Sequence, residues 1–398
     1  MHRRRFLRSA GATALALPAH AALASALARA DAGAAVASAP ATRAPFASPP
    51  PLAPIRASSD RIVALTVCLR PFRPQGPRIE AERVGRRTLI HCYGHGGSGW
   101  SLSWGSAARV LALARATGES RLAVVGCGAI GLTCALAAQR AGLRVRIYAR
   151  ELLPDAPSAR ATGVWSPASR ICTSEHATPA FERDWQAMTR ASFRSYQSLL
   201  GVPGAPVAWR DGYVLSDLPF DAPRAAHDDG EPEYPSLESR LVPDLGPRST
   251  PVADGAHPFP VAHVRRYTQM VFNIAAYSRL LMDEFRLAGG EVVLHEFADA
   301  REFARLRERT VVNAAGHGAR VLVGDASLVP VRGQIARLVP QPEVDYGLTW
   351  LGHNLAVVSR GDGLLVQAQA PGDYGSGDTA PDRAASEAAV ARLASLYA

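Results

Sequence analysis

A glycine-rich turn between an apolar run and a helical segment constrains the fold of this chain more than any other feature. Leu122–Val125 is a short, partly β-branched run typical of a buried strand. The G-x-G-x-x-G sequence Gly126–Gly131 follows, then a helical stretch, Leu132–Ala141, and a second strand, Arg144–Tyr148. In this context the glycines allow a pyrophosphate to approach the backbone at the helix N-terminus. The pattern predicts a dinucleotide site; the alternative is an ordinary tight strand-to-helix turn.

Composition excludes several classes of protein. The 398 residues, 47% of them hydrophobic, are enough for one or two domains. All 44 basic residues are arginine, so no lysine can form a Schiff base or act as a general base. The net charge of +9 is concentrated in the first 30 residues, and no nucleic-acid-binding patch is expected. No C-x-x-C pair occurs, so we expect neither a disulfide framework nor a metal site. The cysteines are Cys68, Cys92, Cys127, Cys134 and Cys172.

The N-terminus has the features of an export signal. Arg3-Arg4 and the following Phe6-Leu7 resemble the twin-arginine motif, and an Ala/Leu-rich stretch with small-residue cleavage candidates follows. Residues 1–30 therefore predict export to the periplasm or the medium; the alternative is an unstructured basic start. Residues 31–59 are rich in Ala, Pro and Ser and predict a disordered linker. No later apolar run is long enough for a stable membrane anchor.

A second strong signal precedes the glycine turn. Ile62–Leu69 and Leu89–Tyr93 are strand candidates, and prolines exclude a helix between Arg70 and Gln75. The Gly- and Trp-rich segment Gly94–Gly105 predicts a loop leading into a helix over Ser106–Ala116. Such a loop brings backbone N–H groups and a helix dipole close to a ligand. We interpret it as a second cofactor contact; the alternative is a flexible surface loop.

The rest of the chain alternates helix and strand patterns around an irregular segment at 217–260. Helices are expected at Phe181–Leu200, Asn273–Ala288 and Asp382–Tyr397. Strands are expected at Tyr213–Leu215, Glu291–Phe297, Thr310–Asn313 and from Val331 to Ile335. A hairpin is expected between Leu355–Val358 and Leu364–Gln369, through Arg360–Gly363.

Together these pieces resemble the D-amino acid oxidase family of FAD flavoproteins. Two motifs are the most specific: Leu69–Gln75 is similar to the family's FRPxRPQ, and His91–Gly97 to HNYGHGG. The other matches are Gly126–Gly131 to GAGxIG, Ala161–Trp165 to AAGLW, Val312–Gly316 to VNCTG and Arg332–Ile335 to RGQI.

The two most specific motifs come last in the family and first here, so the order is that of a circular permutation. The resemblance implies an α/β fold in which a Rossmann-like FAD-binding domain is interleaved with an α+β substrate domain built on a mixed sheet, in circularly permuted order. The expected parts after residue 59 are a permuted segment for the FAD domain and active site (60–118), the FAD-binding βαβ unit (119–180), mostly substrate domain (181–300), FAD-binding strands (301–335) and a substrate-domain hairpin with the terminal helix (336–398).

The chemistry that the resemblance implies is oxidative deamination of a D-amino acid. A hydride passes from the substrate α-carbon to flavin N5, and the imino acid hydrolyses to a 2-oxo acid and ammonia. Oxygen or another acceptor reoxidises the flavin, giving H2O2 in the case of oxygen. Arg70 corresponds to the arginine that binds the substrate carboxylate, and Gly97 to the glycine whose carbonyl accepts from the amine. A small-molecule substrate is the expected partner.

The resemblance also assigns FAD contacts. One group lies in the permuted segment: Gly96, Gly97, Ser98, Gly99, Trp100 and Ser101. The others are Cys127, Gly128, Ala129, Ile130, Ser158, Gly163, Val164, Trp165, Phe297 and Ala315. Arg150 stands where an acidic residue should bind the ribose, with Glu151 one position later, so both are candidates; an arginine would also suit a 2′-phosphate.

Two further departures concern the substrate side. Ala356 stands where the family has an active-site tyrosine, and Tyr346 and Tyr267 are the candidates to supply a hydroxyl instead. The family's LGG is replaced within Leu365–Ala368. Three alternatives follow: a flavin oxidase or dehydrogenase for another amine or amino acid, a catalytically weak FAD-binding protein, or an NAD(P) dehydrogenase.

Overall fold

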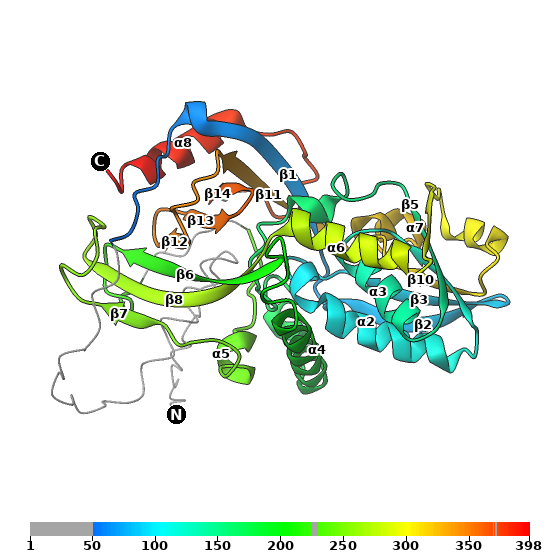
Figure 1. Ribbon diagram of the computed structural model, residues 1–398. Coiled ribbons are helices and arrows are strands. Elements are labelled where there is room, and N and C mark those ends of the chain that lie inside the picture. The colour runs from blue at the N-terminus through cyan, green and yellow to red at the C-terminus, as the bar shows by residue number, and fades with distance from the viewer. Residues whose placement is uncertain (1–50, 224–229, 369, 371) are drawn as a thin grey trace, which may run out of the picture.

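The structure is a computed structural model that describes residues 51–223, 230–368, 370 and 372–398. The predicted export signal and residues 31–50 lie outside this range. Two mixed sheets of six and eight strands lie side by side, and α4 (Pro179–Gln197) projects between them (Figure 1). No helix in the described part of the chain combines the length and apolarity that a membrane crossing requires.

The six-stranded sheet contains the glycine turn. Its order is β2-β3-β10-β4-β5-β9, with every neighbouring pair parallel except β2 and β3. The strands are β2 (Arg78–Val84), β3 (Arg87–Tyr93), β4 (Arg121–Val125), β5 (Arg144–Ala149), β9 (Glu291–Leu294) and β10 (Thr310–Asn313). β4, α3 (Ala129–Arg140) and β5 form the predicted strand–turn–helix–strand unit. β3, which comes earlier in the chain, pairs with β10 on the side away from β4.

Helices cover one face of this sheet. α2 (Gly99–Ala116), α3 and α6 (Ile274–Leu287) pack there around a shared apolar core that includes Leu132, Leu136 and Phe285. The opposite face packs against short helical segments, including α7 (Ala319–Leu322). Five parallel strands between two helical layers give the Rossmann-like half of the expected fold.

The start of α2 corrects one expectation. The helix was expected to begin at Ser106 after a loop, whereas α2 begins at Gly99. Gly105, which favoured a loop, is needed because α4 crosses α2 closely there: a Cβ at Gly105 would overlap the backbone of Met188. The Gly105 N–H donates to the Ser192 hydroxyl at 2.8 Å. Helix–helix packing, rather than turn formation, therefore explains this glycine.

The eight-stranded sheet is mostly antiparallel. Its order is β1-β11-β14-β13-β12-β6-β8-β7, and only β12 and β6 are parallel. The strands are β1 (Ile62–Phe72), β6 (Val207–Ser216), β7 (Thr250–Val252), β8 (His263–Phe272), β11 (Val329–Leu338), β12 (Tyr346–Trp350), β13 (Leu355–Arg360) and β14 (Gly363–Ala368). α8 (Arg383–Ala394) packs on one face with Leu338, Leu364 and Val366. The α/β fold with a mixed-sheet second half is confirmed.

Strand alternation assigns side chains to the other face of this sheet. Antiparallel partners share a face, and β1 pairs with β11 so that Cys68 lies opposite Gly333 and Arg70 opposite Val331. On β13 and β14, Ala356 pairs with Gln367. Because Leu338 and Val366 face α8, residues in the alternate positions face away from it. We call this the inner face, and it carries Arg70, Gly333, Ala356 and Gln367.

Several other expectations are corrected in extent. The hairpin formed by β13 and β14 is confirmed, with Arg360 paired to Gly363. β6 is longer than the expected Tyr213–Leu215, and β9 is shorter than Glu291–Phe297, ending at Leu294. The strongly charged β2 escaped prediction, as did β8 and β12. The described residues of the segment 217–260 are mostly irregular but include β7 and α5 (Leu237–Leu241).

The described end of the expected disordered linker also needs correction. Ile55 is buried in the apolar cluster under α8, and the Arg56 N–H donates to Gln341 Oε1 at 2.8 Å. The Tyr346 hydroxyl lies 2.8 Å from both the Ala53 carbonyl and the Tyr397 hydroxyl. Residues 53–56 are therefore part of the packed domain, and they lie beside the last residues of the chain (Figure 1).

Candidate active site

The predicted glycine turn is formed by close approach of backbone segments. Gly126 has φ +106°, and a Cβ there would lie 2.5 Å from the Ala314 carbonyl oxygen. A Cβ at Gly131 would overlap the carbonyl of Gly126, and one at Gly128 would lie 2.7 Å from Ser158 Oγ. Gly126 and Gly131 thus exclude a side chain, and the turn presents the N-terminus of α3 toward Ser158.

Ser158 connects this turn to the segment that precedes it in the chain. Its hydroxyl accepts a hydrogen bond from the Ala129 N–H at 3.1 Å, and its carbonyl accepts one from Trp100 Nε1 at 2.8 Å. Cys127, in the turn itself, is buried in the core, and burial raises the pKa of its thiol to about 12. Cys127 therefore takes part in the turn through its backbone. Ser158, in contrast, has a hydroxyl that can exchange its present hydrogen bond for one to a ligand.

The residues expected at the adenosine end of the dinucleotide lie close together just after β5. Arg150 forms ion pairs with Glu151 at 3.2 Å and with Glu296 at 3.3 Å. The ring of Phe297 packs in the core against Tyr148, leaving only its backbone for a ligand. An acidic side chain is thus present beside Arg150, and Glu296 is a neighbour that the sequence did not reveal.

The other expected contact near this turn, Ala315, follows β10 and donates its N–H to Asn313 Oδ1 at 3.3 Å. The preceding residue, Ala314, is the one whose carbonyl approaches Gly126. Asn313 Nδ2 is buried without a hydrogen-bond partner among the described residues. The two segments that were expected to contact the dinucleotide, Gly126–Gly131 and Ala315, therefore meet in space.

The loop 161–170 forms one wall of the site. Gly163 (φ +80°) accepts from the Phe272 N–H at 2.6 Å, and Trp165 donates its N–H to the Met270 carbonyl at 2.9 Å, so this part of the loop is joined to β8. Val164 packs on the inner face with Ile335, Val358 and Leu365. These contacts fix the three residues expected to contact the flavin.

In the second half of this loop, successive backbone groups each form a hydrogen bond to a side chain. The Ser166 N–H donates to Ser101 Oγ at 2.8 Å, and the Pro167 carbonyl accepts from Trp185 Nε1 at 2.8 Å. The Ala168 N–H donates to Glu238 Oε1 at 3.0 Å, a carboxyl whose pKa burial raises to about 7. Sequence analysis missed Trp185 and Glu238 in this role because they lie on distant helices.

The permuted segment contacts the end of this loop directly. The Ser169 carbonyl accepts from the Gly97 N–H at 3.0 Å and from Ser98 Oγ at 2.9 Å. A Cβ at Gly96 would overlap the Arg170 carbonyl, and one at Gly97 would overlap Ser169 Oγ. Glycine is therefore required at both positions by the contact between the two loops.

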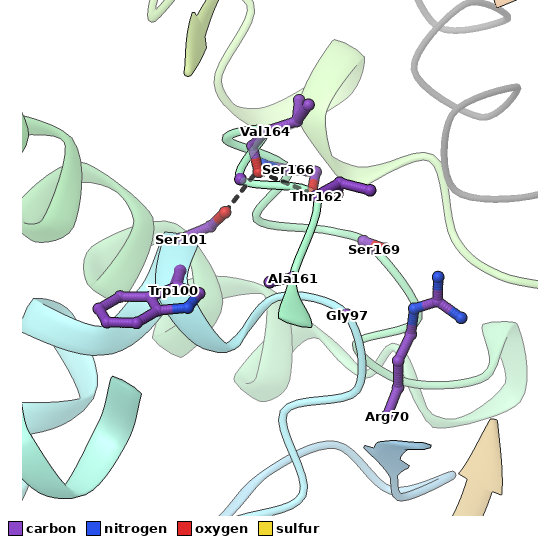
Figure 2. A pocket seen from close by; sticks show the side chains of 10 residues that line it. Arg70, Gly97, Trp100, Ser101, Ala161, Thr162, Val164, Ser166 and Ser169 are labelled. Carbon is purple, nitrogen blue, oxygen red and sulfur yellow. Dashed lines mark hydrogen bonds between the residues drawn. The ribbon is translucent and has the colours of Figure 1, made fainter. Parts of the chain in front are cut away.

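A pocket opens between these segments, with Arg70 at one end and Trp100 at the other (Figure 2). The pocket is lined by predicted site residues from both sides of the glycine turn. Arg70, Gly97, Trp100 and Ser101 precede the turn in the sequence, whereas Gly163 and Val164 follow it. The remaining lining residues are Ala161, Thr162, Ser166 and Ser169.

Arg70 is positioned by the neighbouring strand. Its Nη1 donates to the Arg332 carbonyl at 2.8 Å, and its guanidinium lies over Gly333, where a Cβ would come within 2.5 Å of Nη1. Burial lowers the pKa of Arg70, and the positive charge of Arg170 lowers it further. Arg170 is itself paired with Glu231 at 2.6 Å. Because an arginine remains charged in proteins, Arg70 presents a half-buried cation at the end of the pocket.

The structure separates the two candidate tyrosines. Tyr346 is excluded, since its hydroxyl faces Ala53 and Tyr397 under α8. Tyr267 lies on the inner face over Gly212, and its hydroxyl bonds Thr349, the cross-strand partner of Ala356. Burial raises the pKa of Tyr267 to about 12. Only Tyr267 shares the face with Arg70.

These residues fit a flavin dinucleotide. The Gly128 N-cap position of α3 has no side-chain cap, the glycine cradle lies beside Ser158, and the pocket continues to Arg70. Trp165 Nε1 is buried without a hydrogen-bond partner among the described residues. When FAD is present, we expect its pyrophosphate at the α3 N-terminus and its ring system along Trp100, Gly163 and Val164.

Comparisons with known proteins identify the family of this chain. Residues 121–398 match the family described as DAO, FAD dependent oxidoreductase. The chain is 31% identical over 285 residues to a D-amino-acid oxidase of Rubrobacter xylanophilus, covering 70% of this chain and 77% of that protein. It is 29% identical over 286 residues to one of Streptomyces coelicolor, covering 70% and 78%. A solved L-amino acid deaminase from Proteus vulgaris aligns with a TM-score of 0.41 at 12% identity, over 63% of this chain and 60% of that one.

The chain therefore belongs to the DAO family of FAD dependent oxidoreductases. The predicted cofactor, FAD, and the predicted enzyme class are confirmed, and an NAD(P) dehydrogenase is excluded. The roles of the individual site residues remain predictions.

His95, in the glycine-rich segment, makes stability depend on pH. It is buried, bonds Ser106 Oγ through Nε2 at 2.9 Å, and burial lowers its pKa to about 3 from an ordinary 6.5. It stays neutral in the folded chain but takes up a proton in the unfolded chain below pH 6.5. Stability is therefore complete above that pH and falls as the pH drops toward 3.

We expect His95→Gln, which keeps a polar side chain near Ser106, to lose less stability on acidification. Between about pH 7.5 and pH 5 the reduction in unfolding free energy should be smaller than in the wild type by about 2 kcal/mol. Urea unfolding at the two pH values measures this, with His263→Gln as the control. An unchanged pH dependence in His95→Gln would contradict the assignment.

Proposed function

We propose that this oxidoreductase oxidises D-amino acids to 2-oxo acids and ammonia. The observation that carries the proposal is the half-buried guanidinium of Arg70 at the end of the pocket, beside Gly97 and the residues expected to hold the flavin. A planar guanidinium binds a carboxylate through two parallel hydrogen bonds. The names of the relatives in Rubrobacter and Streptomyces support the same substrate class.

The residues of the chain orient the substrate and exclude water. Arg70 binds the α-carboxylate, and the Gly97 carbonyl accepts a hydrogen bond from the amine, so two contacts fix the α-carbon. Bound FAD supplies a hydride acceptor at N5. Loss of the α-hydride and an amine proton leaves an imino acid, which water hydrolyses, while dioxygen takes the two electrons and two protons to form H2O2.

One observation favours a second candidate, oxidation of another amine or amino acid. Ala356 lies on the inner face where a tyrosine was expected, so no phenol from that position reaches the substrate. A smaller side chain leaves room for a different substrate. The comparison of enantiomers below distinguishes the two candidates.

The direct test is reduction of the flavin without oxygen. FAD-loaded protein is mixed separately with D-amino acids, L-amino acids and simple amines, and the loss of absorbance near about 450 nm is followed. We expect reduction by D-amino acids and none by their L-enantiomers. Reduction by L-amino acids or amines but not by D-amino acids would favour the second candidate, whereas no reduction by any of these compounds would contradict both.

Arg70→Ala should lower kcat/KM for D-amino acids about 100-fold or more, because losing the partner of a buried charge costs about 3 kcal/mol. Arg301→Ala removes a highly exposed arginine and is the control. FAD content and circular dichroism establish that both variants are folded. An unchanged kcat/KM in folded Arg70→Ala would remove Arg70 from the site.

We also propose that the chain is a circular permutation of its family's order. Two observations support it: β1 and β3, which precede the glycine turn, pair with β11 and β10, and Ala53 lies beside Tyr397. The turn around Gly118, between α2 and β4, would be the join between the family's ends. Chain ends that lie close together make such a rearrangement physically inexpensive.

A chain returned to the family's order tests this proposal. Ala398 is joined to residue 51 by a short Gly/Ser linker, and the chain is opened between Gly118 and Glu119. We expect this protein to bind FAD and to melt within a few degrees of residues 51–398 in their natural order. The same linked chain opened within β10 serves as the control that should not fold. Failure of both to bind FAD would contradict the proposal.

Export through the twin-arginine route is proposed on the N-terminal residues alone. The route carries folded proteins, which suits an enzyme that acquires its cofactor in the cytoplasm. Replacing Arg3 and Arg4 by lysine should abolish accumulation of a shortened form outside the cytoplasm, as measured by fractionation and N-terminal mass spectrometry. Retention of the full-length wild-type chain in the cytoplasm would contradict export.

A further inference from the structure

Gln367, in the middle of β14, is a buried glutamine whose amide oxygen has no use in the fold. It is 4% exposed, and its Oε1 has no hydrogen-bond partner among the described residues. An amide left unpaired in the interior costs stability, so such a side chain needs an explanation. A half-turn about its last torsion exchanges the oxygen and the NH2, so either end can face a ligand.

The register places Gln367 on the inner face, between Ile335 and Ala356. Ala356 is the small residue found where a tyrosine was expected. A short side chain on β13 leaves space above the sheet that a long side chain on the adjacent β14 can enter. The expected tyrosine would have placed a large polar side chain on β13. Here the large polar side chain is Gln367 on β14, and its partner on β13, Ala356, is small.

Gln367 also lies near Arg70, the cation proposed to bind the substrate. The guanidinium of Arg70 lies over Gly333, which is the diagonal neighbour of Gln367 across the β11–β14 pair. Such neighbours are about 7–8 Å apart, a separation that a carboxylate between the two side chains can span. Ile335 and Leu365, which flank Gln367, pack with the pocket-lining Val164.

We propose that Gln367 is a substrate-binding residue whose amide NH2 donates a hydrogen bond to the carboxylate held by Arg70. In this arrangement it replaces the hydroxyl that is absent at Ala356. The inference rests on the proposed function, since it takes the substrate of this pocket to be a carboxylate. With the amide turned so that its NH2 takes the position of the unpartnered oxygen, the carboxylate supplies the hydrogen bond that the folded chain does not provide there.

Gln367→Leu separates this role from a structural one. Leucine has a similar size and needs no hydrogen bond, so we expect the ligand-free variant to melt at the same or a higher temperature than the wild type. Benzoate, a carboxylate that cannot be oxidised because its α-carbon carries no hydrogen, is the probe. Its dissociation constant for the FAD-loaded protein, from the change in flavin absorbance, should rise at least about tenfold.

Gln269→Leu is the matched control. Gln269 is also a buried glutamine on the inner face, but it lies on β8, toward the opposite edge of the sheet from Arg70. Its substitution should leave benzoate binding unchanged. A further variant, Gln367→Gly combined with Ala356→Tyr, returns the polar group to β13 and should recover most of the lost affinity.

The outcomes distinguish the inference from the proposed function. Unchanged benzoate affinity in Gln367→Leu, or a lower melting temperature with unchanged affinity, would contradict the inference and leave the function standing. Failure of wild-type protein to bind benzoate would also contradict the inference. Reduction by no D-amino acid, together with benzoate binding that depends on Gln367, would contradict the function alone.

Discussion

The site depends on the close contact between Gly96-Gly97 and Ser169-Arg170. Two chain segments about 70 residues apart meet there so tightly that neither glycine can carry a side chain, and the Ser169 carbonyl receives hydrogen bonds from Gly97 and Ser98. This contact closes the pocket between β1 and the loop 161–170.

The electrostatics of the site follow from burial. Arg70 and Arg170 are two neighbouring cations, and Glu231 pairs with the second, so that the charge of Arg70 remains available to an anion. Nearby, burial keeps His95 neutral and Glu238 easily protonated. A carboxylate entering this environment meets a positive charge already fixed in place, which favours its binding and orientation.

Much of the fold could be predicted from the sequence because glycine spacing and apolar periodicity are local signals. Gly126–Gly131 identified the β4–α3–β5 unit, and the Arg360–Gly363 turn identified the hairpin. The expectations that failed concerned contacts between segments far apart in the sequence. Gly105 favoured a loop but allows α4 to cross α2, and the charged β2 forms a strand because β3 offers it an edge. For the candidate site, Arg70 and Gly97 were identified by motif. Gln367 could not be identified by motif. It stands out because its amide oxygen lacks a hydrogen-bond partner among the described residues and because Ala356 is its cross-strand neighbour, and only the structure reveals both.

The central claim is that residues on both sides of the glycine turn form one pocket for FAD and a substrate carboxylate. A crystal structure of the FAD-loaded protein with benzoate tests it most directly. The account predicts the flavin ring between Trp100 and Val164, with both carboxylate oxygens within about 3 Å of the Arg70 guanidinium nitrogens. A flavin bound elsewhere, or a carboxylate that does not contact Arg70, would contradict it.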